Sequence, residues 1–208
     1  MLIKRTYALC YLVLLVAFTS CECDIEIRAR EDGNQDFALQ LDLGKLVLEA
    51  ADSIAQFAPQ NGALFDTGAI KAHLERSRFT DVAASSASPS QLTLKATGSL
   101  PSLVSQTDTS LRVTLSPRSL AQALSLFPEE ERAGADLLMA PVLTGEAMSA
   151  EEYRDLLALV YGEQFAAEAQ KAAVDFRLLS PKGKAKHFSL PLLDLLTLTG
   201  ERTLSLDF

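Results

Sequence analysis

The sequence predicts an α+β fold, in which one or more antiparallel sheets pack against several amphipathic helices. Short stretches near both ends and in the middle of the chain alternate apolar and polar residues, which is the period of a half-buried strand. Between them, apolar residues recur every three or four positions, as on one face of a helix. Strands and helices occur in groups rather than in strict alternation, which favours α+β over parallel βαβ units.

The first twenty residues have the three-part layout of an export signal. Lys4 and Arg5 precede an apolar run over 7–18, and small polar residues then lead to Cys21. The run has about a dozen residues, whereas a membrane-spanning helix needs roughly 20. We therefore expect residues 1–20 to be a cleavable signal peptide.

The junction Phe18-Thr19-Ser20-Cys21 resembles the lipobox of bacterial lipoproteins. In that motif the cysteine thiol receives a diacylglyceryl group, and cleavage leaves this cysteine as the first residue. Phe18 departs from the usual Leu, as in the relaxed lipoboxes of spirochaetal lipoproteins. The resemblance implies lipid attachment at Cys21, a lipidated N-terminus over 21–23 and a membrane as partner. A secreted protein with an incidental cysteine and an uncleaved anchor are the alternatives.

Composition limits the partners of the mature chain. The net charge of −8 becomes −10 when Lys4 and Arg5 leave with the signal, because no acidic residue leaves with them. An acidic surface argues against nucleic-acid binding and against a polybasic contact with anionic lipid. Of the three cysteines, Cys10 belongs to the signal and Cys23 follows the lipid site, so no internal disulfide is expected. Residues 24–208 are long enough for a single α+β domain.

The first part of this domain is predicted to contain a hairpin and two helices. Residues 24–43 alternate on both sides of the turn sequence 31–34, which predicts two antiparallel strands. Helical spacing predicts one helix over 47–57. A second helix should open at Asp66 or Thr67. The face that this second helix is expected to bury contains Ile70, His73 and Leu74.

The middle of the domain is predicted to return to strands. We expect a short strand over 79–84, a small polar loop over 83–90, and strands over 92–96 and 111–115. Ser116-Pro117 predicts a helix start, since Ser caps helices and Pro suits the first helical position. The apolar face of that helix contains Leu120, Leu124 and Phe127.

The last third is predicted to contain a helical pair and further strands. The acidic run 129–131 suits a helix start, and the apolar segment 136–146 suggests a buried or partly buried connection. Ser149 and Glu152 form a capping box, and a second helix follows Gly162. The first helix of the pair should bury a stripe against the sheet, formed by Tyr153, Leu156, Leu157, Val160 and Tyr161. Strands are then expected over 174–178, 188–190 and 204–208, with 191–198 ambiguous.

Several motifs together resemble an uncharacterised group of spirochaetal, treponemal-type lipoproteins. They are Phe65-Asp66, the segment 136–153, Leu159-Val160-Tyr161-Gly162 and the segment 191–196. No activity is established for the group, so the resemblance implies a phylum and an envelope location but no site.

The search for reactive side chains identifies no catalytic, cofactor-binding or metal-binding residue, and no cofactor is expected. His73 and His187 lack a metal-ligand spacing and are expected to be structural or solvated. No Gly-x-Ser-x-Gly elbow, P-loop or dinucleotide fingerprint occurs. The remaining candidates are acidic: Asp32 with Asp36, Glu151 with Asp155, and Asp194, which we expect to be exposed between buried leucines.

These observations predict a non-enzymatic binding or interaction module of the cell envelope, on the periplasmic or surface side. One alternative is a carrier that holds an apolar small molecule or lipid between sheet and helices, with segments 136–143 and 190–198 as walls. The competing interpretation of both segments is that they fill the core. The interaction module could instead bind another protein of the envelope. The sequence favours an envelope enzyme least of these alternatives.

Overall fold

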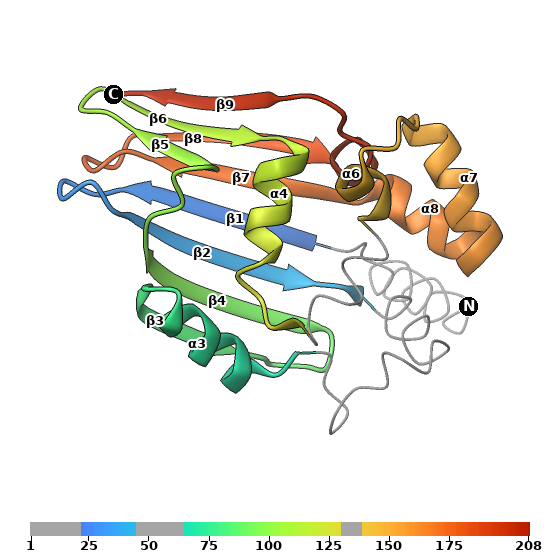
Figure 1. Cartoon of the computed structure of the whole chain (residues 1–208), viewed down its shortest axis with the longest axis horizontal. Helices are drawn as coiled ribbons and strands as arrows, with labels where there is room; N and C mark the ends of the chain where they lie inside the picture. Colours follow the sequence, from blue (N-terminus) through green and yellow to red (C-terminus); the bar gives the residue numbers. More distant parts are fainter. Residues whose placement is uncertain (1–21, 45–64, 130–138) are drawn as a thin grey trace, which may run out of the picture.

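The computed structural model describes residues 22–44, 65–129 and 139–208, which Figure 1 shows in colour. Within these ranges the fold is α+β, as predicted, with mainly antiparallel sheets and helices beside them. The strands are β1 (Glu22–Ala29), β2 (Gln35–Asp42), β3 (Thr80–Ser85), β4 (Gln91–Gly98), β5 (Val104–Gln106), β6 (Ser110–Leu115), β7 (Ala173–Leu179), β8 (Ala185–Pro191) and β9 (Arg202–Asp207). The helices are α3 (Thr67–Arg76), α4 (Pro117–Leu124), α6 (Ala140–Thr144), α7 (Ala150–Tyr161), α8 (Glu163–Lys171) and α9 (Leu192–Leu196).

The predicted hairpin lies at the centre of the large sheet, whose strand order is β3-β4-β2-β1-β7-β8. Gly33 takes a positive φ of 84° in the turn, a conformation that glycine adopts without strain. The register pairs Glu22 with Asp42, so β1 and β2 are paired over their full lengths. On its other side β1 runs parallel to β7, with Glu22 opposite Ala173, while the other neighbours are antiparallel. The first strand of the hairpin therefore lies beside a strand that follows it in the sequence by more than a hundred residues.

The small sheet, of order β5-β6-β9, packs against the β1, β7 and β8 part of the large sheet (Figure 1). Alternate residues of facing strands meet in the space between the two sheets, as expected for a sandwich. Leu111, Val113 and Leu178 have no exposed surface. The buried residues of this sandwich core are Ile27, Ala29, Val104, Leu111, Val113, Leu115, Val174, Phe176, Leu178, Leu190, Leu195, Leu204 and Leu206.

A second core lies under α3, where this helix covers β3, β4 and β2. The Asp66 side chain caps α3 by accepting a backbone N–H at 2.9 Å, and Ile70 and Leu74 are buried as predicted. Phe79 packs directly on Gly98, where a Cβ would lie 2.5 Å from the ring. Glycine is therefore required at this strand end because an aromatic ring occupies the place of its side chain.

The helical pair α7–α8 packs on α9 beyond the end of the large sheet at which β1 begins (Figure 1). The predicted capping box opens α7: Glu152 N–H donates to Ser149 Oγ at 3.2 Å, and Ser149 N–H donates to Glu152 Oε2 at 2.8 Å. Gly162 alone separates the two helices. The buried residues of this third core are Tyr153, Leu157, Phe165, Ala166, Ala169, Leu193 and Leu196.

Some elements differ from the prediction. The strand β5 and the helices α6 and α9 were not predicted, because elements of three to five residues are too short to show a period. The strand β3 runs through Ser85, so the loop before β4 is shorter than the expected 83–90. The strand β1 begins at Glu22, two residues before the predicted start of the domain. The helix expected over 47–57 and residues 136–138 lie outside the described residues.

Candidate functional site

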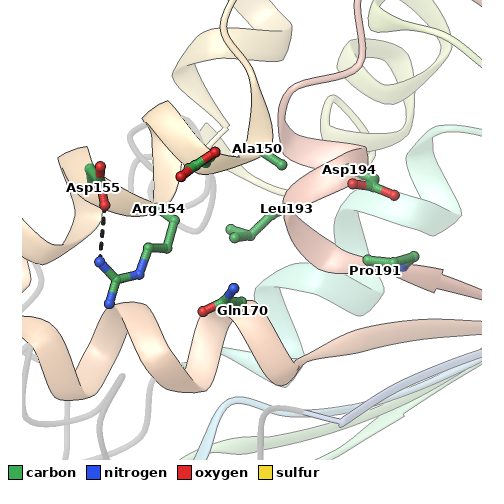
Figure 2. A pocket seen from close by; sticks show the side chains of 8 residues that line it. Ala150, Arg154, Asp155, Gln170, Pro191, Leu193 and Asp194 are labelled. Atoms are coloured by element: carbon green, nitrogen blue, oxygen red, sulfur yellow. Dashed lines mark hydrogen bonds and ion pairs between the residues drawn. The ribbon is translucent and has the colours of Figure 1, made fainter.

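A cleft of about 590 Å³ lies where the start of α7, the end of α8 and the start of α9 meet (Figure 2). The capping box at Ser149 determines where α7 begins. The N–H of Leu192 donates to the Ala172 carbonyl at 2.9 Å, which holds α9 against the junction of α8 with β7. The cleft is therefore built from three helix ends that local hydrogen bonds position. Its lining residues are Ala150, Glu151, Arg154, Asp155, Gln170, Pro191, Leu193 and Asp194.

Arg154 contributes a positive charge to this cleft, and two carboxylates of the same chain already pair with it. Its guanidinium donates to Asp155 Oδ1 at 2.9 Å and also forms an ion pair with Glu163 (Figure 2 shows the first contact). The hydrogen bonds to Asp155 and Glu163 raise the pKa of Arg154, so the guanidinium stays charged. Because Glu163 begins α8, the ion pair joins α7 to α8 across Gly162.

The carboxylates give the cleft an acidic rim. Glu151, Asp155 and Asp194 are all exposed. Asp194 lies between the buried Leu193 and Leu195, which confirms the prediction for this residue. The described residues contain no group of three side chains that could hold a metal ion. The arrangement offers charge and hydrogen bonding to a polar partner.

Tyr153 lies behind the cleft, in the core of the helical pair. It is 2% exposed, and burial raises the pKa of its phenol to about 12. The phenol therefore keeps its proton at physiological pH. Burial also raises the pKa of Tyr161, at the end of the same helix.

The two histidines lie on opposite edges of the large sheet. His73 is half-buried on α3, and its Nε2 lies 3.2 Å from the Ser125 carbonyl, which joins α3 to the end of α4. His187 is exposed on the edge strand β8, opposite Arg177. Both positions agree with the structural and solvated roles that the sequence predicted, and the two side chains do not form a common site.

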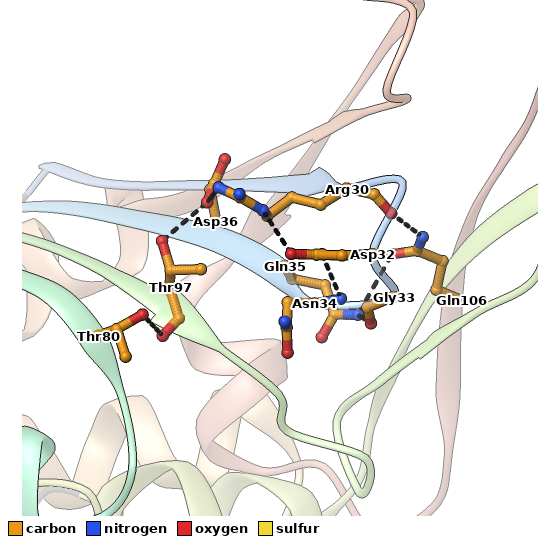
Figure 3. A network of polar contacts seen from close by, with 9 residues as sticks. All are labelled: Arg30, Asp32, Gly33, Asn34, Gln35, Asp36, Thr80, Thr97 and Gln106. Atoms are coloured by element: carbon orange, nitrogen blue, oxygen red, sulfur yellow. Dashed lines mark hydrogen bonds and ion pairs between the residues drawn. The ribbon is translucent and has the colours of Figure 1, made fainter.

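The acidic pair Asp32 and Asp36 belongs to a polar network at the hairpin turn (Figure 3). Arg30 forms ion pairs with Asp32 at 3.4 Å and Asp36 at 3.0 Å. Asp36 also accepts the Thr97 hydroxyl at 2.9 Å, and Gln106 donates to the Arg30 carbonyl at 2.6 Å. The network joins the hairpin to β4 and to β5 of the small sheet. These carboxylates therefore have a structural role.

The apolar stripe expected on α7 is only partly buried. Tyr153 and Leu157 are 2% and 3% exposed, whereas Leu156 is 41%, Leu159 84% and Val160 61% exposed. The expectation that the stripe packs against the sheet is wrong, because α7 packs on α8 and α9 instead. A helix that stands beyond the end of the sheet has a partner for one face only. We call Leu156, Leu159 and Val160 the outer face of α7.

Most apolar side chains in the described parts of the two leucine-rich segments are buried or half-buried. Val142 on α6 is 1% exposed. Leu193 and Leu196 belong to the core of the helical pair, and Leu195 to the sandwich core. This arrangement favours the interpretation that 139–143 and 190–198 fill the core over the interpretation that they line an apolar cavity.

Cys21, the predicted lipid-attachment residue, lies outside the described residues, one position before β1. The strand register places Glu22 beside Ala173, which directly follows the C-cap of α8. The start of β1 and the base of the helical pair are therefore neighbours at one end of the large sheet (Figure 1).

In the described ranges no helix is long and apolar enough to cross a membrane. The predicted resemblance to spirochaetal lipoproteins rests on the sequence motifs alone. Comparisons with family models, with curated proteins and with solved structures returned no match to this chain.

Proposed function

We propose that this protein is a lipoprotein of a bacterial cell envelope, exported by residues 1–20 and anchored to a membrane through acyl chains on Cys21. The observation that carries the proposal is the N-terminal pattern of Lys4 and Arg5, a short apolar run and the Ser20-Cys21 junction. Two or three acyl chains, at about 0.8 kcal/mol per buried CH₂, make such attachment effectively permanent. The spirochaetal resemblance of the motifs favours a spirochaete as the source.

The domain on the exported side is proposed to be a non-enzymatic binding or interaction module. Two features support this proposal. Arg154 is already paired with Asp155 and Glu163, which leaves the cleft with an acidic rim rather than with a reactive centre. The outer face of α7 exposes apolar surface that the protein's own core does not use. Neither feature requires a bound cofactor.

Metabolic labelling with a palmitate analogue tests the anchor. The full chain should incorporate label, and Cys21→Ala should abolish incorporation because the thiol that forms the bond is gone. Cys23→Ala is the matched control, since it removes a cysteine two positions away, and it should label like the wild type. Equal labelling of Cys21→Ala and the wild type would rule the proposal out.

A further inference from the structure

The outer face of α7 is an apolar surface at the tip of the helical pair. Among the described residues, Leu156, Leu159 and Val160 are the exposed large hydrophobic side chains. They lie three and four positions apart, so they share one side of the helix. The six residues over 156–161 contain no charged side chain. Contiguous apolar exposure of this kind marks an interaction surface, whereas single exposed leucines do not.

The outer face lies in the half of α7 farthest from the sheet. The chain passes from the end of α7 through Gly162 into α8, and α8 then leads directly to β7. The nine residues of α8 extend about 14 Å, at about 1.5 Å per residue. The helical pair therefore projects beyond the end of the large sheet (Figure 1), and the outer face lies in the part of α7 next to the turn at Gly162.

The start of β1 lies at the base of this projection. Glu22 pairs with Ala173, the first residue after α8 and its cap. On the proposed function, Cys21 is acylated, and one peptide step of about 3.8 Å joins its Cα to that of Glu22. No linker then separates the anchor from the folded sheet. This end of the molecule must face the bilayer, because the paired strand cannot move away from its own acyl chains.

We infer that the outer face of α7 enters the interface of the bilayer that holds the acylated N-terminus, so that the protein has a second membrane contact beside its anchor. The inference rests on the proposed acylation at Cys21. An interfacial helix buries its apolar face by about 5–10 Å, which the projection of α8 is long enough to supply. Tyr161 at the tip has the amphipathic ring that is enriched at the level of the headgroups.

Charge and area favour the bilayer over other occupants. The net charge of −10 expected after signal removal opposes attraction to anionic lipid, so the contact depends on apolar side chains. Three side chains are also too few for a stable dimer, which buries about 800 Å² on each partner. The opposite end of the sheet has the turns at Gly33 and Gly183, with Lys182 exposed, and would face away from the membrane.

The absence of tryptophan from the chain makes this orientation measurable. Leu159→Trp introduces one tryptophan at the most exposed position of the outer face, and Lys182→Trp introduces one in the turn between β7 and β8 as the matched control. Each full-length, acylated variant is reconstituted into phosphatidylcholine vesicles with and without bromine on the acyl chains. Flotation of the vesicles shows whether the protein is anchored, and circular dichroism melts show whether each variant is folded.

In floating vesicles, the emission of the tryptophan at 159 should shift to shorter wavelength and lose at least half of its intensity to the brominated lipid. The tryptophan at 182 should show neither change. Unquenched emission at 159 in floating vesicles would overturn the inference and leave the anchor intact. A blue-shifted but unquenched tryptophan would mean that protein covers the outer face, either residues 45–64 or a second copy, and would overturn it equally. Failure to float would instead overturn the proposed anchor.

A second variant tests the apolar character of the contact. Leu156→Trp supplies the fluorophore, and Leu159→Asp with Val160→Asp then places two charges on the outer face. Both aspartates replace exposed side chains in the last turn of α7, so the core is unchanged and the melting temperature should fall only by the small cost of negative charge at a helix C-terminus. Quenching by brominated lipid should fall several-fold while flotation is unchanged. Unaltered quenching would show that the tryptophan is near lipid for another reason and would contradict the inference.

Discussion

The sandwich core and the helical pair α7–α8 use leucine in different ways. In the sandwich core, Leu111 has no exposed surface and Leu115 has 1%. In the helical pair, Leu157 is 3% exposed, whereas Leu159, two residues later, is 84% exposed. The strand has one buried face, and its alternating pattern matches that face. The helix α7 has apolar residues on two faces, and the fold provides a partner for one of them.

Apolar residues therefore carry different information in the two regions. In a sandwich, each strand turns every second side chain toward the facing sheet. The alternation of apolar residues along the strand therefore shows directly which side chains are packed. A helix at the periphery is buried only where another element reaches it, so an apolar residue there reports either packing or a contact with a partner. Substitutions in the sandwich core should therefore lower the stability most, and substitutions on the outer face of α7 should lower it least.

Leu111→Ala should have the largest effect on stability. The side chain is enclosed by both sheets, and its removal loses transfer free energy and leaves a cavity. The loss should be about 2–5 kcal/mol. Thermal and urea unfolding of residues 22–208, followed by circular dichroism, would measure it. A melting temperature equal to that of the wild type would mean that the sandwich core is not close-packed.

Leu157→Ala should be next, toward the lower end of about 2–5 kcal/mol. The residue is 3% exposed, but the helical pair contacts the rest of the fold through few elements and can relax around the vacancy. The same unfolding experiments would rank Leu157→Ala against Leu111→Ala. A larger loss at Leu157 would reverse the comparison and make the helical pair the more tightly packed region.

Ser149→Ala should cost about 0.5–2 kcal/mol, because the N-cap hydroxyl accepts a backbone N–H that would otherwise lack a partner. Ser149→Asp is the matched control, since aspartate also caps helices and should retain most of the stability. Chemical unfolding curves of the three proteins provide the measurement. An alanine variant as stable as the wild type would show that the cap contributes little to α7.

The charge of Glu152 should make a smaller, pH-dependent contribution. The Ser149 N–H and hydroxyl, which donate to this carboxylate, hold its pKa below the ordinary value. A carboxyl with a lowered pKa in the folded chain stabilises it above the pKa of the unfolded chain, and this stability is lost as pH falls through the folded pKa. Glu152→Gln should therefore melt below the wild type at pH 7, and the difference should shrink as pH falls through the lowered pKa of Glu152. A constant difference between them would attribute the effect to packing.

Leu159→Ala should change stability least, by no more than about 0.5 kcal/mol, because most of the side chain already faces solvent. Unfolding experiments on the same residues 22–208 would compare it with Leu157→Ala, its buried counterpart on the same helix. A loss similar to that of Leu157→Ala would mean that the outer face is packed in solution, contrary to its exposure.

Features that depend on a few neighbouring residues were predictable from the sequence. The hairpin over 24–43 has its alternation and turn within one segment, and the caps at Asp66, Ser116 and Ser149 act over three residues. The exposed position of Asp194 also followed from its leucine neighbours. The cleft was not predictable, because it forms where the ends of three helices meet.

The fold class, the strands and helices with clear periods, and the proposal that Cys21 is acylated all came from the sequence alone. These depend on local periodicity, on capping chemistry and on the order of residues near the N-terminus. The pairing of β1 with β7, and the packing of α7 beside α8 rather than on the sheet, became visible in the three-dimensional structure. The physical reason is that both outcomes depend on which surfaces meet in the folded chain. The periodicity of apolar residues predicts that a helix or strand has an apolar face, but it does not predict which element packs on that face.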